Sequence, residues 1–87
     1  MAIAFPNRSR SFDDDSHSIR FTGHDGMFEV RFAVDLDAVA WLESRITGNE
    51  AESLAVFDRV RSRIEDVAAR AYGRSRKASY RISASDF

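Results

Sequence analysis

The 87-residue chain has no cysteine, one proline and four glycines, and it contains no long uninterrupted apolar run. Without cysteine it can form neither a disulfide framework nor a thiolate metal site. The opening stretch MAIAFPNRSR has too short an apolar run for a secretory signal or a membrane span, so we expect neither. We predict one domain over residues 1–87 with a single thin core, because a chain of this size buries roughly 60% of its unfolded surface.

The charge of the chain is nearly balanced but unevenly spread. Hydrophobic residues make up 44% and charged residues 31%, which is typical of a globular domain and not of a disordered chain. The formal net charge is −1. Although the whole chain is nearly neutral, the segment 70–81 carries basic residues and no acidic one, which makes it the strongest electrostatic feature of the sequence. Its basic residues are Arg70, Arg74, Arg76, Lys77 and Arg81.

Two alternating stretches, SIRFT and FEVRFAV, predict an antiparallel hairpin with one buried face. The second stretch would turn these side chains toward the core: Phe28, Val30, Phe32 and Val34. Only an even-numbered loop keeps Phe21 and Phe28 on the same face. A two-residue Asp25-Gly26 turn would place two arginines opposite each other, whereas a four-residue loop over 23–26 would place Arg20 opposite Glu29. Cross-strand charge favours the four-residue loop.

Two helical patterns follow the hairpin. Asp35 can cap a helix from Leu36 to Ile46, which Thr47-Gly48 would end. Asn49 and Glu52 then have the spacing of a capping box, and a long amphipathic helix should continue to Tyr72, with Gly73 after its end. Its apolar stripe consists of Phe57, Val60, Ile64, Val67 and Ala71.

The last apolar alternation, over residues 78–82, predicts a short final strand, after which residues 83–86 can form a helical turn. Ile3, Phe5 and Phe12 allow a further N-terminal strand. We therefore predict an α+β fold: a small antiparallel sheet with the order β-β-α-α-β, with or without the extra strand, and two helices packed on one face.

Three side chains interrupt this pattern. Glu43 and Arg61 both fall inside apolar stripes, so they could meet between the helices, or each could extend to solvent from the edge of its stripe. Trp41 lies on the far side of its helix from the apolar residues. It could be an exposed partner anchor, but we favour packing against a neighbouring loop, because large aromatics are usually buried.

The polar stretch SFDDDSHSIRFTGHDG, residues 11–26, contains both histidines but does not predict a metal site. His17 and His24 are seven residues apart on one strand, or about 23 Å when extended. The run Asp13–Asp15 lacks the spacing of a calcium-binding loop. We interpret the stretch as two polar turns that frame a strand. We expect no metal and no cofactor.

Catalytic motifs are equally weak. His24 beside Asp25 suggests a dyad, but no serine lies in the strand–turn–helix context of a nucleophile. No segment has the glycine spacing of a phosphate-binding loop. A small sandwich of this length also leaves little volume for a pocket. We therefore expect a protein that is not an enzyme and name no catalytic residue.

Five segments, taken in order, resemble the bacterial domain of unknown function 1488 family: FPNRSRSF, IRFTGHDG, EVRFAV, RSRIEDVAARAY and KASYRISASDF. The resemblance runs from Phe5 to Phe87 and rests on the order and spacing of the segments; it is weak in residues 13–16 and around Trp41. It implies a compact α+β bacterial domain of the cytoplasm. It implies no activity, cofactor or catalytic residue.

Two binding functions remain from the sequence. The favoured one is a small regulatory module that binds a protein partner or a second copy, with Trp41 as candidate anchor. The alternative is a nucleic-acid-binding protein, in which the basic segment 70–81 contacts phosphates while Tyr72 and Tyr80 stack on bases. The simpler interpretation of the basic segment is a solvated helix end. We expect no membrane partner.

Overall fold

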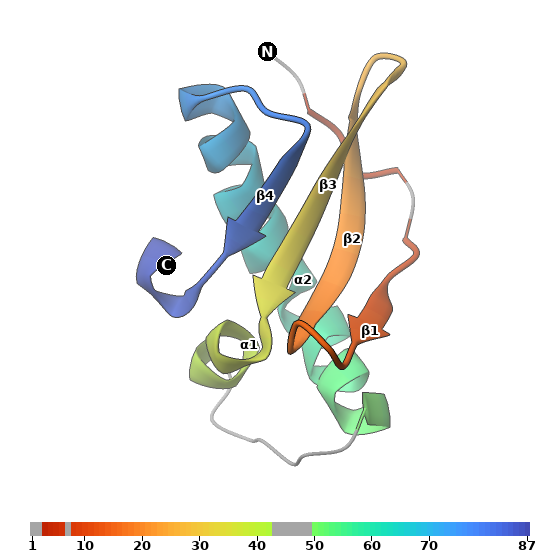
Figure 1. Ribbon diagram of the computed structural model, residues 1–87, viewed down its shortest axis with the longest axis vertical. Helices are drawn as coiled ribbons and strands as arrows, with labels where there is room; N and C mark the ends of the chain where they lie inside the picture. Colours follow the sequence, from red (N-terminus) through yellow and green to blue (C-terminus); the bar gives the residue numbers. More distant parts are fainter. Residues whose placement is uncertain (1–2, 7, 43–49) are drawn as a thin grey trace.

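The computed structural model describes residues 3–6, 8–42 and 50–87 (Figure 1). Four strands form one sheet in the order β1-β2-β3-β4. The elements are β1 (Ser11–Asp13), β2 (Ser18–Asp25), β3 (Phe28–Asp35), α1 (Leu36–Leu42), α2 (Glu50–Arg74), β4 (Ser79–Ile82) and a 3₁₀ turn (Ala84–Asp86). The α+β class, the order of strands and helices, and the extra N-terminal strand are confirmed.

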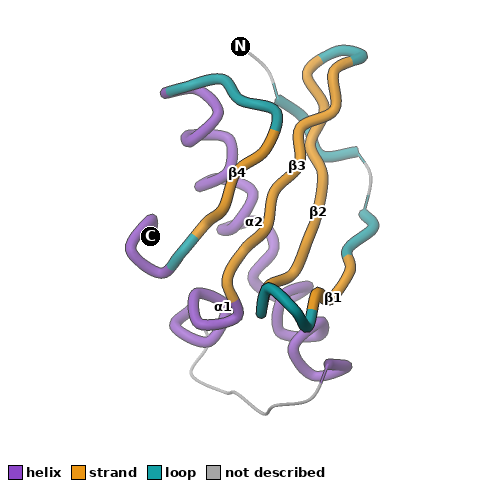
Figure 2. The backbone as a smooth tube through the Cα atoms, in the orientation of Figure 1, coloured by secondary structure: helices purple, strands orange, loops and turns teal. Residues whose placement is uncertain are grey.

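The sheet is mixed, which corrects the expectation of a wholly antiparallel one. β1, β2 and β3 pair antiparallel, but β4 pairs parallel to β3. The reason is the length of α2: its 25 residues span about 36 Å from the first Cα atom to the last, and the longest extent of the molecule is 36 Å. The helix therefore returns the chain to the start of β3, and β4 runs beside it in the same direction (Figure 2).

The hairpin register differs from both predicted alternatives. Asp25 pairs with Phe28, so the turn consists of Gly26 and Met27, and Gly26 has a left-handed φ of 63°. Arg20 lies opposite Ala33 and not opposite Glu29. This register lets the strands pair up to their tips and brings buried Phe21 opposite Phe32, so packing of the rings outweighs the small gain from one cross-strand charge pair.

Helix α2 covers one face of the sheet and completes the core there (Figure 1). The rings of Phe21 and Phe32 stack at 5.3 Å, and Phe57 of α2 lies 5.6 Å from Phe21. In the predicted stripe, Phe57, Ile64 and Val67 are buried, while the other two members are only partly covered. Helix α1 follows β3 directly at one end of the sheet and contributes Ala38 and Val39 to the same core.

The ends of the helices differ from the prediction in detail. The predicted end of α1 and the predicted cap of α2 lie in 43–49, outside the described residues. Helix α2 passes through Gly73 and ends at Arg74, so Gly73 is not the residue that stops it. The predicted last turn is present, with the backbone N–H of Ser83 donating to Asp86 at 2.8 Å.

Arg61 is buried inside the stripe of α2 and does not extend to solvent. Its guanidinium donates to Glu65 at 2.8 Å and to the carbonyl oxygen of Arg8 at 2.9 Å, and it lies 5.2 Å from the ring centre of Phe57. This buried cation therefore ties the N-terminal segment to α2. The proposed partner Glu43 lies outside the described residues.

Two phenylalanines of β3 provide a test of the register. Phe32 is 1% exposed, whereas Phe28 is 55% exposed at the hairpin tip, although both side chains belong to the same face. Phe32→Ala should lower the free energy of unfolding by about 3–5 kcal/mol, because it leaves a cavity among packed rings. Phe28→Ala should cost no more than about 1 kcal/mol. Urea denaturation measures both, and equal losses would contradict this register.

Candidate binding face

The face of the sheet opposite α2 carries no helix in the described chain and lies toward the viewer in Figure 1. Alternation along the strands places polar side chains on it. They surround a shallow, solvent-open hollow of about 610 Å³. The side chains that this face contributes to the hollow are Ser11, Arg20, Thr22, Glu29, Arg31, Ala33, Ser79 and Arg81.

Three arginines from three adjacent strands stand around one small residue. Arg20 of β2, Ala33 of β3 and Arg81 of β4 form one row across the sheet. Neighbouring strands lie about 4.8 Å apart, so the two arginine backbones are about 10 Å apart, with Ala33 between them. Arg31 precedes Ala33 by two residues on the same face, about 7 Å along the strand. Ala33 and these three arginines all line the hollow, and the small side chain of Ala33 takes up little of it.

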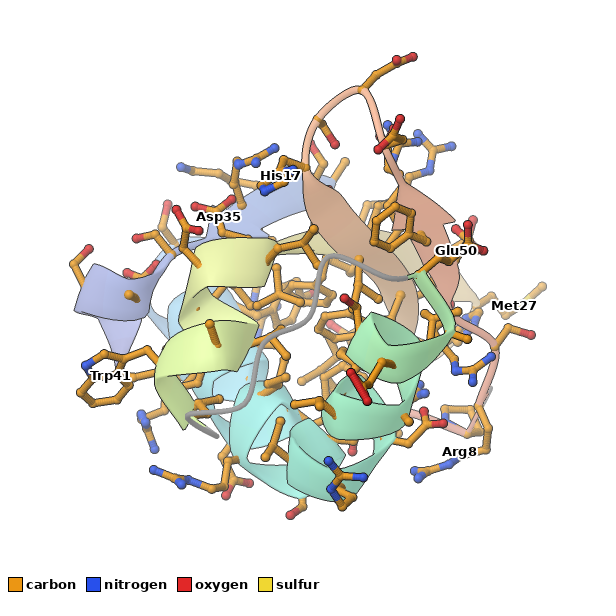
Figure 3. The ribbon with its side chains drawn as sticks, turned by 90° about the horizontal axis from the view of Figure 1, so that it is seen from below. Arg8, His17, Met27, Asp35, Trp41 and Glu50 are labelled. Atoms are coloured by element: carbon orange, nitrogen blue, oxygen red, sulfur yellow. The ribbon has the colours of Figure 1, made fainter. Side chains whose placement is uncertain are left out.

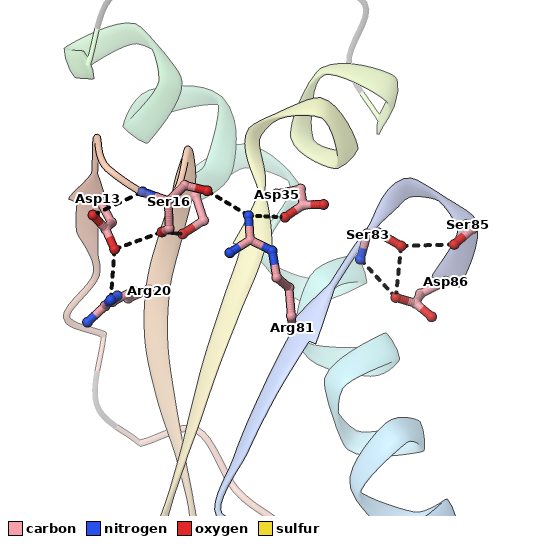
Figure 4. Close-up of polar contacts among 9 residues, drawn as sticks. Asp13, Ser16, Arg20, Asp35, Arg81, Ser83, Ser85 and Asp86 are labelled. Carbon is pink, nitrogen blue, oxygen red and sulfur yellow. Dashed lines mark hydrogen bonds and ion pairs between the residues drawn. The ribbon is translucent and has the colours of Figure 1, made fainter.

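Asp13 holds the first of these arginines. Its carboxylate lies 2.7 Å from Arg20 and accepts hydrogen bonds from the hydroxyl group of Ser16 at 2.7 Å and from the backbone N–H of Asp15 at 3.2 Å (Figure 4). The hydrogen bond from Ser16 is the main cause that lowers the pKa of Asp13, and the charge of Arg20 lowers it further while burial opposes both. The carboxylate thus organises the β1–β2 turn and orients Arg20 at once.

Asp35 holds Arg81, the second of these arginines. Arg81 reaches across β3, donates to the carbonyl oxygen of Ser16 at 2.6 Å and lies 2.6 Å from Oδ1 of Asp35 (Figure 4). That oxygen is buried, and its contact with Arg81 is an ion pair without hydrogen-bond alignment. Arg81 therefore links the edge strand to the β1–β2 turn through charge and a backbone contact.

Arg31 differs from the other arginines of the hollow. Arg10, at the rim of the hollow, forms a bidentate ion pair with Asp58 of α2, with two hydrogen bonds of 3.0 Å. These hydrogen bonds raise the pKa of the Arg10 guanidinium. In the described part of the chain, Arg31 forms neither an ion pair nor a side-chain hydrogen bond, and its side chain is exposed. Among the arginines of the hollow, it is the one that no carboxylate of the described residues engages.

The predicted basic cluster is split by the fold. Arg81 belongs to the open face, whereas Arg76 lies 5.5 Å from the ring centre of Tyr72 and Lys77 lies 5.8 Å from that of Tyr80. Arg70 and Arg74, from the last turns of α2, are exposed. Four of the five predicted contact residues therefore lie near the end of α2, and the fifth faces the hollow.

The two tyrosines of this segment make contacts within the fold, and the buried ring of Tyr72 is not accessible for stacking on bases. Tyr72 is buried and donates its hydroxyl hydrogen to Asp25 at 2.5 Å, a bond that, with burial, raises the pKa of Tyr72. The ring of Tyr80 stacks on Phe32 at 5.3 Å. Its hydroxyl group accepts from the backbone N–H of Lys77 and donates to the carbonyl oxygen of Ser75.

Trp41 is 62% exposed on the outer side of α1, so the expectation that it packs against a loop is wrong (Figure 3). Met27 and Phe28 are also exposed, but they lie at the hairpin tip, away from α1 at the other end of β3. These apolar side chains do not form one patch. A role of Trp41 as a partner anchor stays a prediction.

The stretch 11–26 forms the two polar turns that its sequence predicts. In the first turn, Asp13 accepts a hydrogen bond from the backbone N–H of Ser16, and His17 has a left-handed φ of 56°. The second turn begins at Gly26. His17 precedes β2 and His24 lies near its end, so the strand separates them. Among the described residues, no three histidine or acidic side chains are grouped as metal ligands would be. Within the same ranges, no helix has the length and apolar character needed to cross a membrane.

Comparison with known proteins agrees with this fold. A family model described as a protein of unknown function, DUF1488, matches residues 3–83. The chain belongs to the DUF1488 family. A crystal structure of a DUF1488 protein of unknown function from Shewanella loihica PV-4 superposes with a TM-score of 0.83 at 17% identity, over 92% of this chain and 90% of the other. A search of curated proteins gives no significant match.

The lowered pKa of Asp13 predicts an acid-sensitive contribution to stability. Because the folded-state pKa lies below the unfolded value, the ionised carboxylate stabilises the fold above about pH 4, and this contribution is lost as the pH falls through the folded-state pKa. Asp13→Asn should therefore destabilise the protein at pH 7 and have less effect at pH 2.5, as urea denaturation at both values would show. Asp14→Asn, at an exposed neighbour, is the matched control. Equal losses at both pH values would contradict the assignment.

Proposed function

We propose that this DUF1488 protein is a non-enzymatic binding module of the bacterial cytoplasm, and that it contacts a protein partner or a second copy through the open face of its sheet. The observation that carries the proposal is the solvent-open hollow of about 610 Å³ framed by arginines from three strands. The bacterial setting follows the Shewanella origin of the similar structure. Arginine is enriched where protein surfaces meet, because one side chain combines charge, hydrogen bonds and apolar contact.

The composition of the hollow argues for binding and against catalysis. Its lining within the described chain includes serine and threonine hydroxyl groups but no histidine or cysteine. Glu29 is its one acidic side chain, and no hydrogen bond joins Glu29 to a hydroxyl group there. A nucleophile needs an activating base within hydrogen-bond reach. The hollow is also open to solvent, whereas catalytic sites generally exclude water.

The distribution of charge favours a protein over a nucleic acid. On the open face, the arginines lie between Asp13 and Asp35 toward one end and Glu29 toward the other. A phosphate backbone that extended along the strands would pass over these carboxylates. The strands place no phenylalanine, tyrosine or tryptophan side chain on this face for bases to stack on, and His24 is its one aromatic ring. A protein surface can match such mixed charge, which favours specificity.

Site-directed photo-crosslinking tests the proposal. A benzophenone amino acid at Thr22, on the open face, should crosslink to one defined protein or to a second copy in bacterial lysate. The same group at Asp66, an exposed position of α2, is the matched control. Mass spectrometry of the products would identify the partner. Absence of a specific product from Thr22, or the same products from both positions, would rule out the open face as the binding surface.

A second candidate function rests on three cations outside the hollow. Arg74, Arg76 and Lys77 are exposed and form no ion pair in the described chain, so they could contact the phosphates of a nucleic acid. Fluorescence anisotropy with labelled single- and double-stranded DNA and RNA tests this at low and physiological salt. Binding that weakens steeply with salt and disappears in the triple variant Arg74→Glu, Arg76→Glu, Lys77→Glu would support it. No binding at low salt would remove it.

A further inference from the structure

We infer that the three arginines Arg20, Arg31 and Arg81 form a carboxylate-binding site over Ala33, and that the site takes a short acidic segment of a protein partner. The inference deepens the proposed function and rests on it, since it names the chemistry that the open face recognises. The cluster is assembled by pairing of β2 with β3 and of β3 with β4, which places the three residues around one alanine.

The arginines are already arranged by carboxylates of the chain itself. Asp13 contacts Arg20 at 2.7 Å and Asp35 contacts Arg81 at 2.6 Å, both from the same end of the sheet. These contacts engage one terminal nitrogen of each guanidinium. Each guanidinium carries five N–H donors, so donors remain on both after these contacts. A ligand therefore meets side chains whose conformations are already restricted, which reduces the entropy lost on binding.

Arg31 supplies the positive charge of the hollow that no ion pair of the described residues engages, although Glu29 lies two residues away on the same face of β3. It has neither an ion pair nor a side-chain hydrogen bond in the described ranges. A carboxylate above Ala33 would lie between Arg31 along β3 and the two arginines on the flanking strands. Guanidinium and carboxylate groups form paired, charge-assisted hydrogen bonds, which are about twice as strong as neutral ones. We therefore expect Arg31 to contribute the largest share of the binding.

The dimensions of the basic region limit the ligand to a short segment. The region spans about 10 Å across the strands and about 7 Å along them. Beyond it, Asp35 and Glu29 occupy the same strand on either side, and both would repel a longer polyanion. Two adjacent acidic residues in an extended segment match this area, with neutral or basic residues on each side. Thr22 and Ser79, which flank Arg31 in its row, add hydroxyl donors.

Chemical-shift titration of the intact protein by NMR tests the site, since it detects weak binding at individual residues. The probes are the peptide acetyl-GGEEGG-amide, the matched peptide acetyl-GGQQGG-amide, and inorganic phosphate. We expect the glutamate peptide to shift the backbone amides of Thr22, Arg31, Ala33 and Ser79 in a saturable manner, and to bind at least about tenfold more tightly than the glutamine peptide. No saturable shift at these residues, or equal binding of both peptides, would overturn the inference.

Three variants separate recognition from folding. Arg31→Gln removes the arginine charge that no ion pair engages and should weaken binding of the glutamate peptide by about tenfold or more, whereas Arg63→Gln, at an exposed arginine of α2, should leave binding unchanged. Ala33→Leu keeps every charge but fills the space between the arginines, so it should also abolish binding. Unchanged melting temperatures would show that all three variants fold. Retained affinity in both Arg31→Gln and Ala33→Leu would contradict the site.

Phosphate and the crosslinking partner give two further outcomes. Phosphate that binds as tightly as the glutamate peptide, at the same residues, would overturn carboxylate recognition in favour of a general anion site. A specific crosslink from Thr22 that the glutamate peptide does not displace would overturn the acidic segment while the proposed protein-binding function stands. Loss of the crosslink itself would instead count against the proposed function.

Discussion

The fold depends on the burial of one sheet face under a single long helix. At the centre of that layer, the ring of Phe21 stacks on Phe32 at 5.3 Å and tilts against Phe57 at 5.6 Å. Among the described residues, α2 is the one helix long enough to span the sheet, and it covers one face. The other face stays in water, so the strands alternate between apolar and polar side chains, and the polar set becomes the surface on which the protein can meet a partner.

Carboxylates at one end of the sheet link this solvated surface to the stability of the fold. Asp13 closes the β1–β2 turn while it holds Arg20, and Arg81 joins edge strand β4 to Asp35 and to the backbone of Ser16. Exposed ion pairs contribute little individually. Here they also orient side chains around Ala33, so the same contacts that support a turn and an edge strand prepare the arginines for a ligand.

Much of the binding face follows from local pattern. Alternation alone indicates that Arg20, Arg31 and Arg81 point away from the core, because each lies between two apolar or aromatic neighbours in its strand. The sequence does not show that they are neighbours. Their proximity depends on a turn at Gly26 and Met27 and on the parallel pairing of β4 with β3. The apolar pattern does not determine this register, because a register shifted by two residues keeps the same side chains on each face.

The sequence by itself determined the α+β class, the order of elements, the apolar stripe of α2 and the polar turns of residues 11–26, because these depend on short-range periodicity and turn chemistry. Only the tertiary structure decided which arginines line one hollow, that Tyr72 and Tyr80 are used in packing, that Arg61 is buried, and that Trp41 is exposed. These outcomes depend on contacts between segments far apart in the chain, where the packing of the whole core outweighs the preference of any single residue.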